Sequence, residues 1–379
     1  MQRTLMCLLI GKLGYEAIPA EDGEQALDLV QSTDAQILIS DLHMPGLNGI
    51  ELTQEVRKLN LDHYIHIIMI TGRDDEEDRS KALEAGVDDF MSKGHNPTML
   101  TARIRAATRL IHHEMELADR NRILKEAKDR IEDDLRAAAS AQRSLLPQLE
   151  DQILGFRVSS AFVPSAIVSG DMFGCFALSD ERLGFYAVDV SGHGVRASLL
   201  SVAIGHLITP DYFRNAITSE DGGNDLAAMV SALNKRFFSF ESDEYFTMFC
   251  GVIDKTTGKL DFCQAGHPSP LFLGPKGTVQ VIGDGGFPVG ILNSAEFENE
   301  SFQFDEGGLF IMCSDAAIEA TNETERPFGL RRLQELVESN ADSPACSMPK
   351  TIVSALTAWR GGVPLEDDLT VVSIERTIE

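Results

Sequence analysis

The chain has 379 residues, enough for two or three domains that each bury a hydrophobic core. Acidic residues outnumber basic ones by 59 to 33, and the net charge of −26 argues against binding to nucleic acid or to an anionic membrane surface. No apolar run is long enough to span a membrane, and the six cysteines include no CxxC pair. We therefore expect a cytoplasmic protein without a zinc site or a disulfide framework.

The first part of the chain, residues 1–98, alternates helical and strand-like segments. An amphipathic run covers 1–13, and helical periodicity returns at 24–30 and 50–59. Short apolar strands are expected at 37–40 and 65–70, and a third strand ends near 92. Strands that alternate with helices predict a doubly wound α/β sheet with parallel strands.

Residues 99–146 contain neither glycine nor proline and predict one long helix. The companion row three positions before its main heptad row is mixed and includes Asn121, a polar residue of the kind that can fix the register of a dimeric coiled coil. We expect a homodimer through a coiled coil over 99–146; the alternative is a single linker helix packed on a neighbouring domain. The main row recurs every seven residues and comprises Leu110, Leu117, Leu124, Ile131, Ala138 and Leu145.

The last part, residues 147–379, is dominated by short strands with helices in pairs. This arrangement predicts an α+β sandwich. The domains are therefore expected at 1–98, 99–146 and 147–379. Strands are predicted at 156–163, 172–178, 183–190, 246–254, 260–264, 309–313 and 369–374, and helices at 197–208, 226–240, 330–339 and 349–359.

Three strand ends in the first part each offer a polar side chain: Asp41, Thr71 and Lys93. The carboxyl ends of parallel strands lie along one edge of a sheet, where ligands bind. A carboxylate there could accept a phosphoryl group, while the hydroxyl and the ammonium group could bind its oxygens.

These segments resemble the receiver domains of two-component response regulators. Residues 37–49 resemble the phosphorylation-site signature of that family, and residues 85–93 resemble its closing motif. The resemblance implies that Asp41 is the phosphoacceptor, Thr71 the switch hydroxyl, Phe90 the switch aromatic and Lys93 the phosphate-binding lysine, with a sensor histidine kinase upstream. It also implies a first strand ending in two acidic residues that hold Mg²⁺. We expect that strand to be encoded upstream of Met1, so that the receiver is truncated at its N-terminus here.

Four aspartates in the last part, Asp171, Asp189, Asp315 and Asp367, lie at strand ends or turns. A carboxylate at the end of a buried strand is costly unless it is paired or binds a cation. Oxygen ligands favour Mg²⁺ or Mn²⁺ over zinc. Two such ions, roughly 3.5–4 Å apart, can clamp a phosphate and activate a water.

Residues 140–376 resemble the protein phosphatase 2C (PPM) family, in particular its bacterial SpoIIE/RsbU-type branch. The matching runs are 141–147, 189–194, 247–252, 265–270 and 367–370. The resemblance implies a four-layer α-β-β-α sandwich and a protein-serine/threonine phosphatase that uses two Mn²⁺ or Mg²⁺ ions to direct a water at phosphorus, without a covalent phosphoenzyme. It implies that the metal ligands are Asp171, Asp189, Asp315, Asp367 and the Val190 carbonyl.

Two histidines accompany these runs. His193 is a candidate acid for the leaving serine oxygen, and a structural role for this turn histidine is the alternative. We expect His267 to be structural.

The whole sequence therefore predicts a receiver-controlled serine phosphatase, whose substrate would be the phosphoserine of an anti-sigma-factor antagonist in a partner-switching pathway. The alternative is a catalytically inactive adaptor that binds a regulatory partner. The truncated receiver and two departures from the branch motivate it: Gly174 stands where a second aspartate is frequent, and Ala316 stands where glycine is usual. If position 316 needed a positive φ, alanine would strain the turn.

Overall fold

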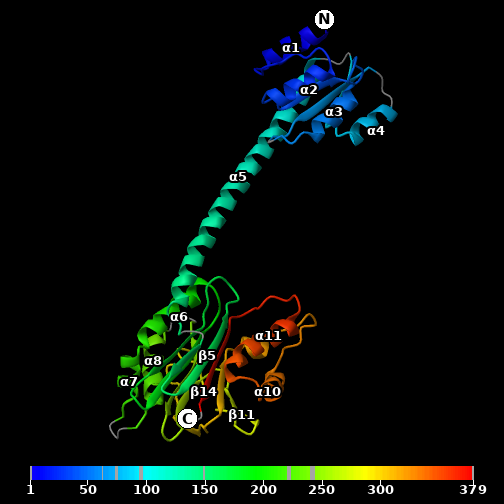
Figure 1. Cartoon of the computed structure of the whole chain (residues 1–379). Helices are drawn as coiled ribbons and strands as arrows, with labels where there is room; N and C mark the ends of the chain where they lie inside the picture. The colour runs from blue at the N-terminus through cyan, green and yellow to red at the C-terminus, as the bar shows by residue number, and fades with distance from the viewer. Residues whose placement is uncertain are drawn as a thin grey trace. The chain divides into compact units, whose positions relative to one another are not determined.

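The structure, a computed structural model, describes residues 2–61, 63–72, 76–93, 97–147, 150–219, 223–239 and 244–377. The chain divides into two compact units, Met1–Asp129 and Arg130–Glu379. Helix α5 (Pro97–Arg143) begins in the first unit and ends in the second (Figure 1). Among the described residues, no helix is both long enough and apolar enough to cross a lipid bilayer.

The first unit is built on three parallel strands in the order β1 (Ile37–Asp41), β2 (His66–Thr71) and β3 (Asp89–Ser92). Every residue of the central strand is buried, as the unbroken apolar run predicted. The parallel α/β prediction is therefore confirmed. The accompanying helices are α1 (Gln2–Lys12), α2 (Gly23–Ser32), α3 (Gly49–Lys58) and α4 (Glu76–Glu84).

Local sequence fixes where α2 and α3 begin. The Asp22 carboxylate accepts a 2.8 Å hydrogen bond from the backbone N–H of Gln25. Asn48 and Glu51 form a capping box, in which each side chain accepts a hydrogen bond from the other residue's backbone N–H. Both caps satisfy N–H groups that the first turn of a helix leaves unpaired.

Strand β1 is an edge of the described sheet, because its described strand partner is β2 alone. A cavity of about 780 Å³ runs beside it and is lined by residues of α1, α2 and the first part of α5. The expected strand upstream of Met1 concerns residues outside this sequence and stays a prediction.

Helix α5 is continuous over 47 residues, which confirms the long helix expected from the absence of glycine and proline. Four large apolar residues of its heptad row, Leu110, Leu117, Leu124 and Ile131, are 46% to 67% exposed. A second helix could cover this row, so the coiled-coil dimer stays a prediction.

The second unit contains two antiparallel sheets. The six-stranded sheet has the order β11 (Val279–Val281), β10 (Leu271–Leu273), β13 (Leu309–Cys313), β14 (Leu369–Arg376), β5 (Phe156–Val163) and β4 (Glu150–Ile153). The five-stranded sheet has the order β12 (Glu300–Gln303), β9 (Lys259–Ala265), β8 (Phe246–Asp254), β7 (Arg182–Val190) and β6 (Met172–Ala177).

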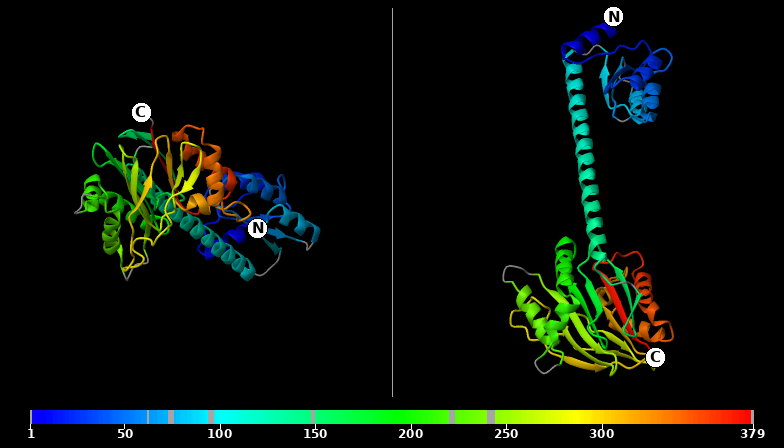
Figure 2. Two further views of the ribbon diagram at one scale, coloured as in Figure 1. Left: turned by 90° about the horizontal axis from the view of Figure 1, so that it is seen from below. Right: turned by 60° about the vertical axis from the view of Figure 1, so that its left-hand side comes forward.

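Between the two sheets lies a core rich in phenylalanine, in which the rings of Phe185, Phe249 and Phe310 contact one another. Helices cover both outer faces (Figure 2). The four-layer α-β-β-α prediction is confirmed. The five-stranded sheet carries α6 (Val195–Leu207), α7 (Pro210–Ile217) and α8 (Leu226–Phe237), and the six-stranded sheet carries α9 (Ala316–Glu319), α10 (Leu330–Ser339), the 3-10 turn η1 (Ala345–Ser347) and α11 (Met348–Arg360).

Several elements were not predicted. Strands β4, β10, β11 and β12 have only three or four residues, too few for a clear alternation of polar and apolar positions. Helix α7 did carry a signal, because Thr209 caps it and Pro210 occupies its first turn. The helix predicted at 226–240 ends at Phe237, and position 240 lies outside the described residues.

Candidate active site

The three predicted polar residues of the first unit lie at one edge of its sheet. Asp41 ends β1, Thr71 ends β2, and Lys93 follows β3 directly. The Lys93 ammonium forms an ion pair with the Asp41 carboxylate, and the Lys93 backbone N–H donates a 2.6 Å hydrogen bond to the Thr71 carbonyl. The structure thus brings together a carboxylate, a hydroxyl and a cation at the carboxyl ends of parallel strands.

Phe90 lies in β3, three residues before Lys93, and is half-buried. The Arg79 guanidinium of α4 stands over its ring, 5.4 Å from the ring centroid. An aromatic ring held this way touches both the sheet and α4. Its role as the switch aromatic stays a prediction.

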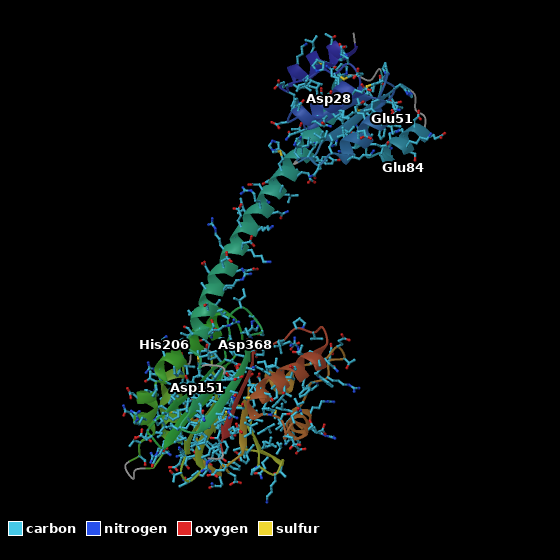
Figure 3. The ribbon with its side chains drawn as sticks, in the orientation of Figure 1. Asp28, Glu51, Glu84, Asp151, His206 and Asp368 are labelled. Atoms are coloured by element: carbon cyan, nitrogen blue, oxygen red, sulfur yellow. The ribbon has the colours of Figure 1, made fainter. Side chains whose placement is uncertain are left out.

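In the second unit, each sheet supplies two of the four predicted aspartates. Asp171 precedes β6 and Asp189 lies within β7, whereas Asp315 comes shortly after β13 and Asp367 shortly before β14. The four carboxylates are close enough for their charges to affect one another's pKa values. Asp368, which directly follows Asp367 in the sequence, is labelled in Figure 3.

Burial and mutual repulsion raise the pKa values of these carboxyls. Burial is the main cause for Asp189, whose pKa rises to about 8, and the charges of Asp315 and Asp367 add to it. Burial, then the charge of Asp189, raises the pKa of Asp171 well above its usual range. Burial, then Asp367, raises the pKa of Asp315 to about 6. Without a counter-charge, such a cluster favours its protonated form.

Two atoms indicate what this cluster lacks. Asp171 Oδ1 and Asp315 Oδ1 are buried and have no hydrogen-bond partner among the described residues. A buried carboxylate oxygen without a partner is costly, and a divalent cation with oxygen ligands would satisfy it. Within the described ranges, no three His, Cys, Asp or Glu side chains already form an ion-sized cage. The fit to Mg²⁺ or Mn²⁺ rests on the chemistry of the donors, because these ions prefer carboxylate oxygens.

The other two predicted site residues follow Asp189: Val190 ends β7, and His193 lies in the turn after it. Val190 is buried, and a Cβ at Gly170 would stand only 3.0 Å from its carbonyl oxygen, so glycine permits the close approach of the two segments. His193 is exposed. Burial raises the pKa of Asp367 and nearby His193 opposes that shift, so the imidazole lies within electrostatic reach of the cluster.

Sequence reasoning did not assign roles to two residues that position the cluster. Thr370 Oγ1 donates a 2.5 Å hydrogen bond to Asp171 Oδ2. The buried Asp368 carboxylate accepts hydrogen bonds from the backbone N–H groups of Ser165 and Gly170, at 2.6 and 2.7 Å. Both residues belong to the run 367–370 that carried the resemblance, but only the fold shows which segments they hold.

His267 is fully buried, and burial lowers its pKa to about 3. Its Nδ1 lies 2.9 Å from the hydroxyl of Thr247, and its Nε2 has no hydrogen-bond partner in the part of the chain that the structure describes. A neutral imidazole in this position is consistent with the expected structural role.

The structure accommodates both departures from the branch, Gly174 and Ala316. A Cβ at Gly174 would lie 2.4 Å from the Tyr186 ring, so the ring fills the space that a side chain would need. Ala316 is the first residue of α9 and is not among the residues with positive φ. The strain considered for alanine at this position is therefore absent.

Comparison with known families covers both units. The family model for the stage II sporulation protein E (SpoIIE) matches residues 179–377, and the response regulator receiver domain matches residues 1–105. Asp189, Asp315 and Asp367 lie inside the first match, and Asp171 lies just before it. Both resemblances inferred from the motifs are confirmed at the level of the family.

Individual relatives agree with this division. The chain is 24% identical over 249 residues to the phosphoserine phosphatase RsbP of Bacillus subtilis, covering 64% of this chain and 57% of that protein. It is 31% identical over 109 residues to the phosphate regulon transcriptional regulatory protein PhoB of Escherichia coli, covering 29% of this chain and 48% of that protein. The chain thus spans about half the length of these curated relatives.

Among solved structures, the SiaA-PP2C domain of Pseudomonas aeruginosa matches with a TM-score of 0.57 at 22% identity, covering 66% of this chain and 98% of that one. This likeness shows that the second unit has the PP2C fold. The SpoIIE family model matches more than half of the residues of the chain. The chain therefore belongs to the SpoIIE family and combines a PP2C-type domain with a response regulator receiver domain.

Proposed function

We propose that this chain is a metal-dependent protein serine phosphatase controlled by its receiver domain. The observation that carries the proposal is the pair of buried, unpartnered oxygens on Asp171 and Asp315, within a cluster of four mutually repelling carboxylates. Phosphatases of the SpoIIE family are metal-dependent, and a relative named phosphoserine phosphatase matches 64% of the chain. The fold, the donor set and the family therefore support one activity.

In this proposal Asp171, Asp189, Asp315 and Asp367 hold two Mn²⁺ or Mg²⁺ ions, and the Val190 carbonyl adds a ligand. Bound ions would supply positive charge for the phosphate oxygens and lower the pKa of a water molecule. The carboxylates would hold the ions in place, and the positive charge of the ions would offset the repulsion between the carboxylates.

The leaving serine oxygen must gain a proton as the ester bond breaks. His193 is the candidate donor, because its imidazole is exposed to an incoming substrate and lies near Asp367. The alternative, a structural role for this turn histidine, predicts that replacing it lowers stability rather than turnover.

The regulatory part of the proposal concerns the receiver domain. Asp41 would accept a phosphoryl group that derives from a sensor histidine kinase, with Thr71, Phe90 and Lys93 sensing it. Helix α5 would form a coiled coil with a second copy of the chain. The proposed substrate is a phosphoserine on an anti-sigma-factor antagonist, encountered in the cytoplasm.

The adaptor hypothesis is the second candidate function. It was motivated by Gly174 and Ala316, and the packing of Tyr186 and the start of α9 account for these two residues without loss of the metal-binding carboxylates. An adaptor would bind its partner and leave phosphoserine intact.

The decisive experiment measures Mn²⁺-dependent phosphate release from a phosphoserine protein. The unmodified chain should release phosphate, and Asp189→Asn should lower the rate at least 100-fold while the circular dichroism spectrum is unchanged. Asp180→Asn, a change of the same kind at an exposed turn residue, should have no effect. Undiminished release by Asp189→Asn would reject the metal assignment, and no release by the unmodified chain would favour the adaptor.

A further inference from the structure

A small cavity lies beside Asp171 in the second unit. Residues of both sheets line it, among them Ala187 of β7, Met312 of β13 and Thr370 of β14. Its volume is about 10 Å³, roughly the least that holds one water molecule. Proteins leave apolar cavities dry, whereas a wall with polar partners can hold a buried water. The polar groups on the wall therefore decide what this cavity contains.

Two of the lining residues carry a buried polar atom that no described residue satisfies: His267 Nε2 and Asp171 Oδ1. The two residues are 3% and 1% exposed, so bulk water does not reach them. The other polar residues of the wall are paired, because Thr370 donates to Asp171 Oδ2 and the Ser314 hydroxyl donates to the Asp368 carbonyl. Two unpaired polar atoms beside one cavity would be costly without a partner in it.

The contact with Thr247 indicates which imidazole nitrogen carries the proton. His267 Nδ1 lies 2.9 Å from the Thr247 hydroxyl and is the one partner that the described residues offer this hydroxyl. Burial lowers the pKa of His267 to about 3, so the ring is neutral and carries a single N–H. If the hydroxyl donates to Nδ1, that N–H is on Nε2. Nε2 is then a donor, and the Asp171 carboxylate is an acceptor.

We propose that His267 is a positioning residue for Asp171, acting through one water molecule that accepts a hydrogen bond from Nε2 and donates one to Oδ1. The inference rests on the proposed function, in which Asp171 is a metal ligand. A carboxylate oxygen has two lone pairs, so Oδ1 can accept this hydrogen bond and still bind a cation.

This bridge would complete the support of Asp171. Thr370 already holds Oδ2, and the water would hold Oδ1, so both oxygens of one ligand are oriented by groups outside the metal site. Hydrogen bonds to the charged form of a buried carboxyl also favour that form, which is the one that binds metal. Groups that orient a metal ligand typically change metal affinity about 10- to 100-fold when they are removed.

The first test measures Mn²⁺ binding by calorimetry with the full chain, without substrate, and counts only the binding that Asp189→Asn abolishes. In His267→Asn the amide can reach Thr247 but not the cavity, and the Kd for Mn²⁺ should rise about tenfold or more. In His267→Gln the amide nitrogen stands near the position of Nε2, and the Kd should stay within about threefold of the unmodified chain. His206→Asn, at an exposed position of α6, is the matched control.

The second test needs no metal. Nuclear magnetic resonance of the full chain with ¹⁵N-labelled histidine, in EDTA, locates the ring proton, and His267→Asn identifies the signal by removing it. The proton should be on Nε2; a proton on Nδ1 would overturn the inference.

A further variant leaves the imidazole in place. Thr247→Val removes the hydroxyl that sets the tautomer, should also raise the Kd, and replaces His267→Asn if that variant does not fold. A lower Tm with an unchanged Kd would show that the ring only packs. Equal increases of the Kd in His267→Asn and His267→Gln would reject the contact through Nε2.

Failure of the inference and failure of the proposed function look different. If the unmodified chain shows no Mn²⁺ binding that depends on Asp189, the proposed function fails, whatever the position of the ring proton. If it binds Mn²⁺ and His267→Asn binds it equally well, the function stands and the role of His267 is rejected.

Discussion

The hydroxyl of Thr370 donates a 2.5 Å hydrogen bond to Oδ2 of Asp171, which is 199 positions away in the sequence. Both residues are almost fully buried, and they come from different sheets of the sandwich. The hydrogen bond opposes the effect of burial, which raises the pKa of Asp171. Thr370 therefore favours the charged form of a proposed metal ligand.

Thr370→Val should weaken Mn²⁺ binding by roughly tenfold, because valine keeps the shape of threonine but cannot donate the hydrogen bond. Calorimetry on the two chains measures the difference. The fold should be retained, and Thr357→Val, which loses a hydroxyl from the surface of α11, should bind Mn²⁺ normally. Equal affinity in the Thr370 variant would mean that the hydroxyl is irrelevant to the site.

Without metal, the second unit should lose stability as the pH rises. Folding raises the pKa of Asp315 to about 6 and that of Asp189 to about 8, so the folded state keeps protons that the unfolded state releases near pH 4. Below pH 4 both carboxyls make their full favourable contribution to the free energy of unfolding. This contribution is lost as the pH rises through 6 for Asp315 and through 8 for Asp189, at about 1.4 kcal/mol per pH unit for each carboxyl.

Thermal unfolding in EDTA between pH 5 and 9 tests this dependence. The unfolding transition of the second unit is identified as the one whose Tm changes when Mn²⁺ is added. The Tm of the unmodified chain should fall more steeply with pH than that of Asp189→Asn, whose amide does not titrate. Excess Mn²⁺ should remove most of the slope, because it binds the charged carboxylates of the folded state. Parallel slopes for the two proteins without metal would contradict the assigned pKa of Asp189.

Leu124→Glu should convert a dimer into a monomer, because it places a charge in the heptad row of α5. Light scattering at tens of micromolar protein measures the mass. Ile123→Glu is a matched control, since Ile123 (52% exposed) is also accessible, as Leu124 (67%) is, but lies outside the heptad row. If the unmodified chain is already monomeric, or if both variants dissociate equally, the coiled-coil prediction is wrong.

Gly174→Asp should destabilise the second unit instead of adding a metal ligand. The Tyr186 ring stands 2.4 Å from where the new Cβ would be, and the added carboxylate would be buried. Overpacking together with a buried charge should cost about 3 kcal/mol or more in the free energy of unfolding. Gly362→Asp, at a position with open space around it, should have little effect. Thermal denaturation measures the Tm of both variants. Equal Tm values would contradict the packing around Gly174.

The sequence alone determined the order and class of the domains. Its short apolar strands ending in Asp41 and Thr71 predicted parallel pairing, which the register of β1 with β2 confirms. The absence of glycine and proline predicted α5 as one helix. These features depend on local periodicity, and a single chain displays them directly. Strands of three or four residues, such as β10 and β11, were missed because they form only when neighbouring strands pair with them.

The tertiary structure decided how the site is built. Motifs placed four aspartates at strand ends, but which oxygens lack partners depends on packing between two sheets. The same holds for His267, whose place in a turn gave no sign that it would line a cavity together with Asp171. A sequence pattern records which side chains are available at each position. Burial and long-range hydrogen bonds arise only when distant segments meet, and these interactions set the charge and position of the carboxylates.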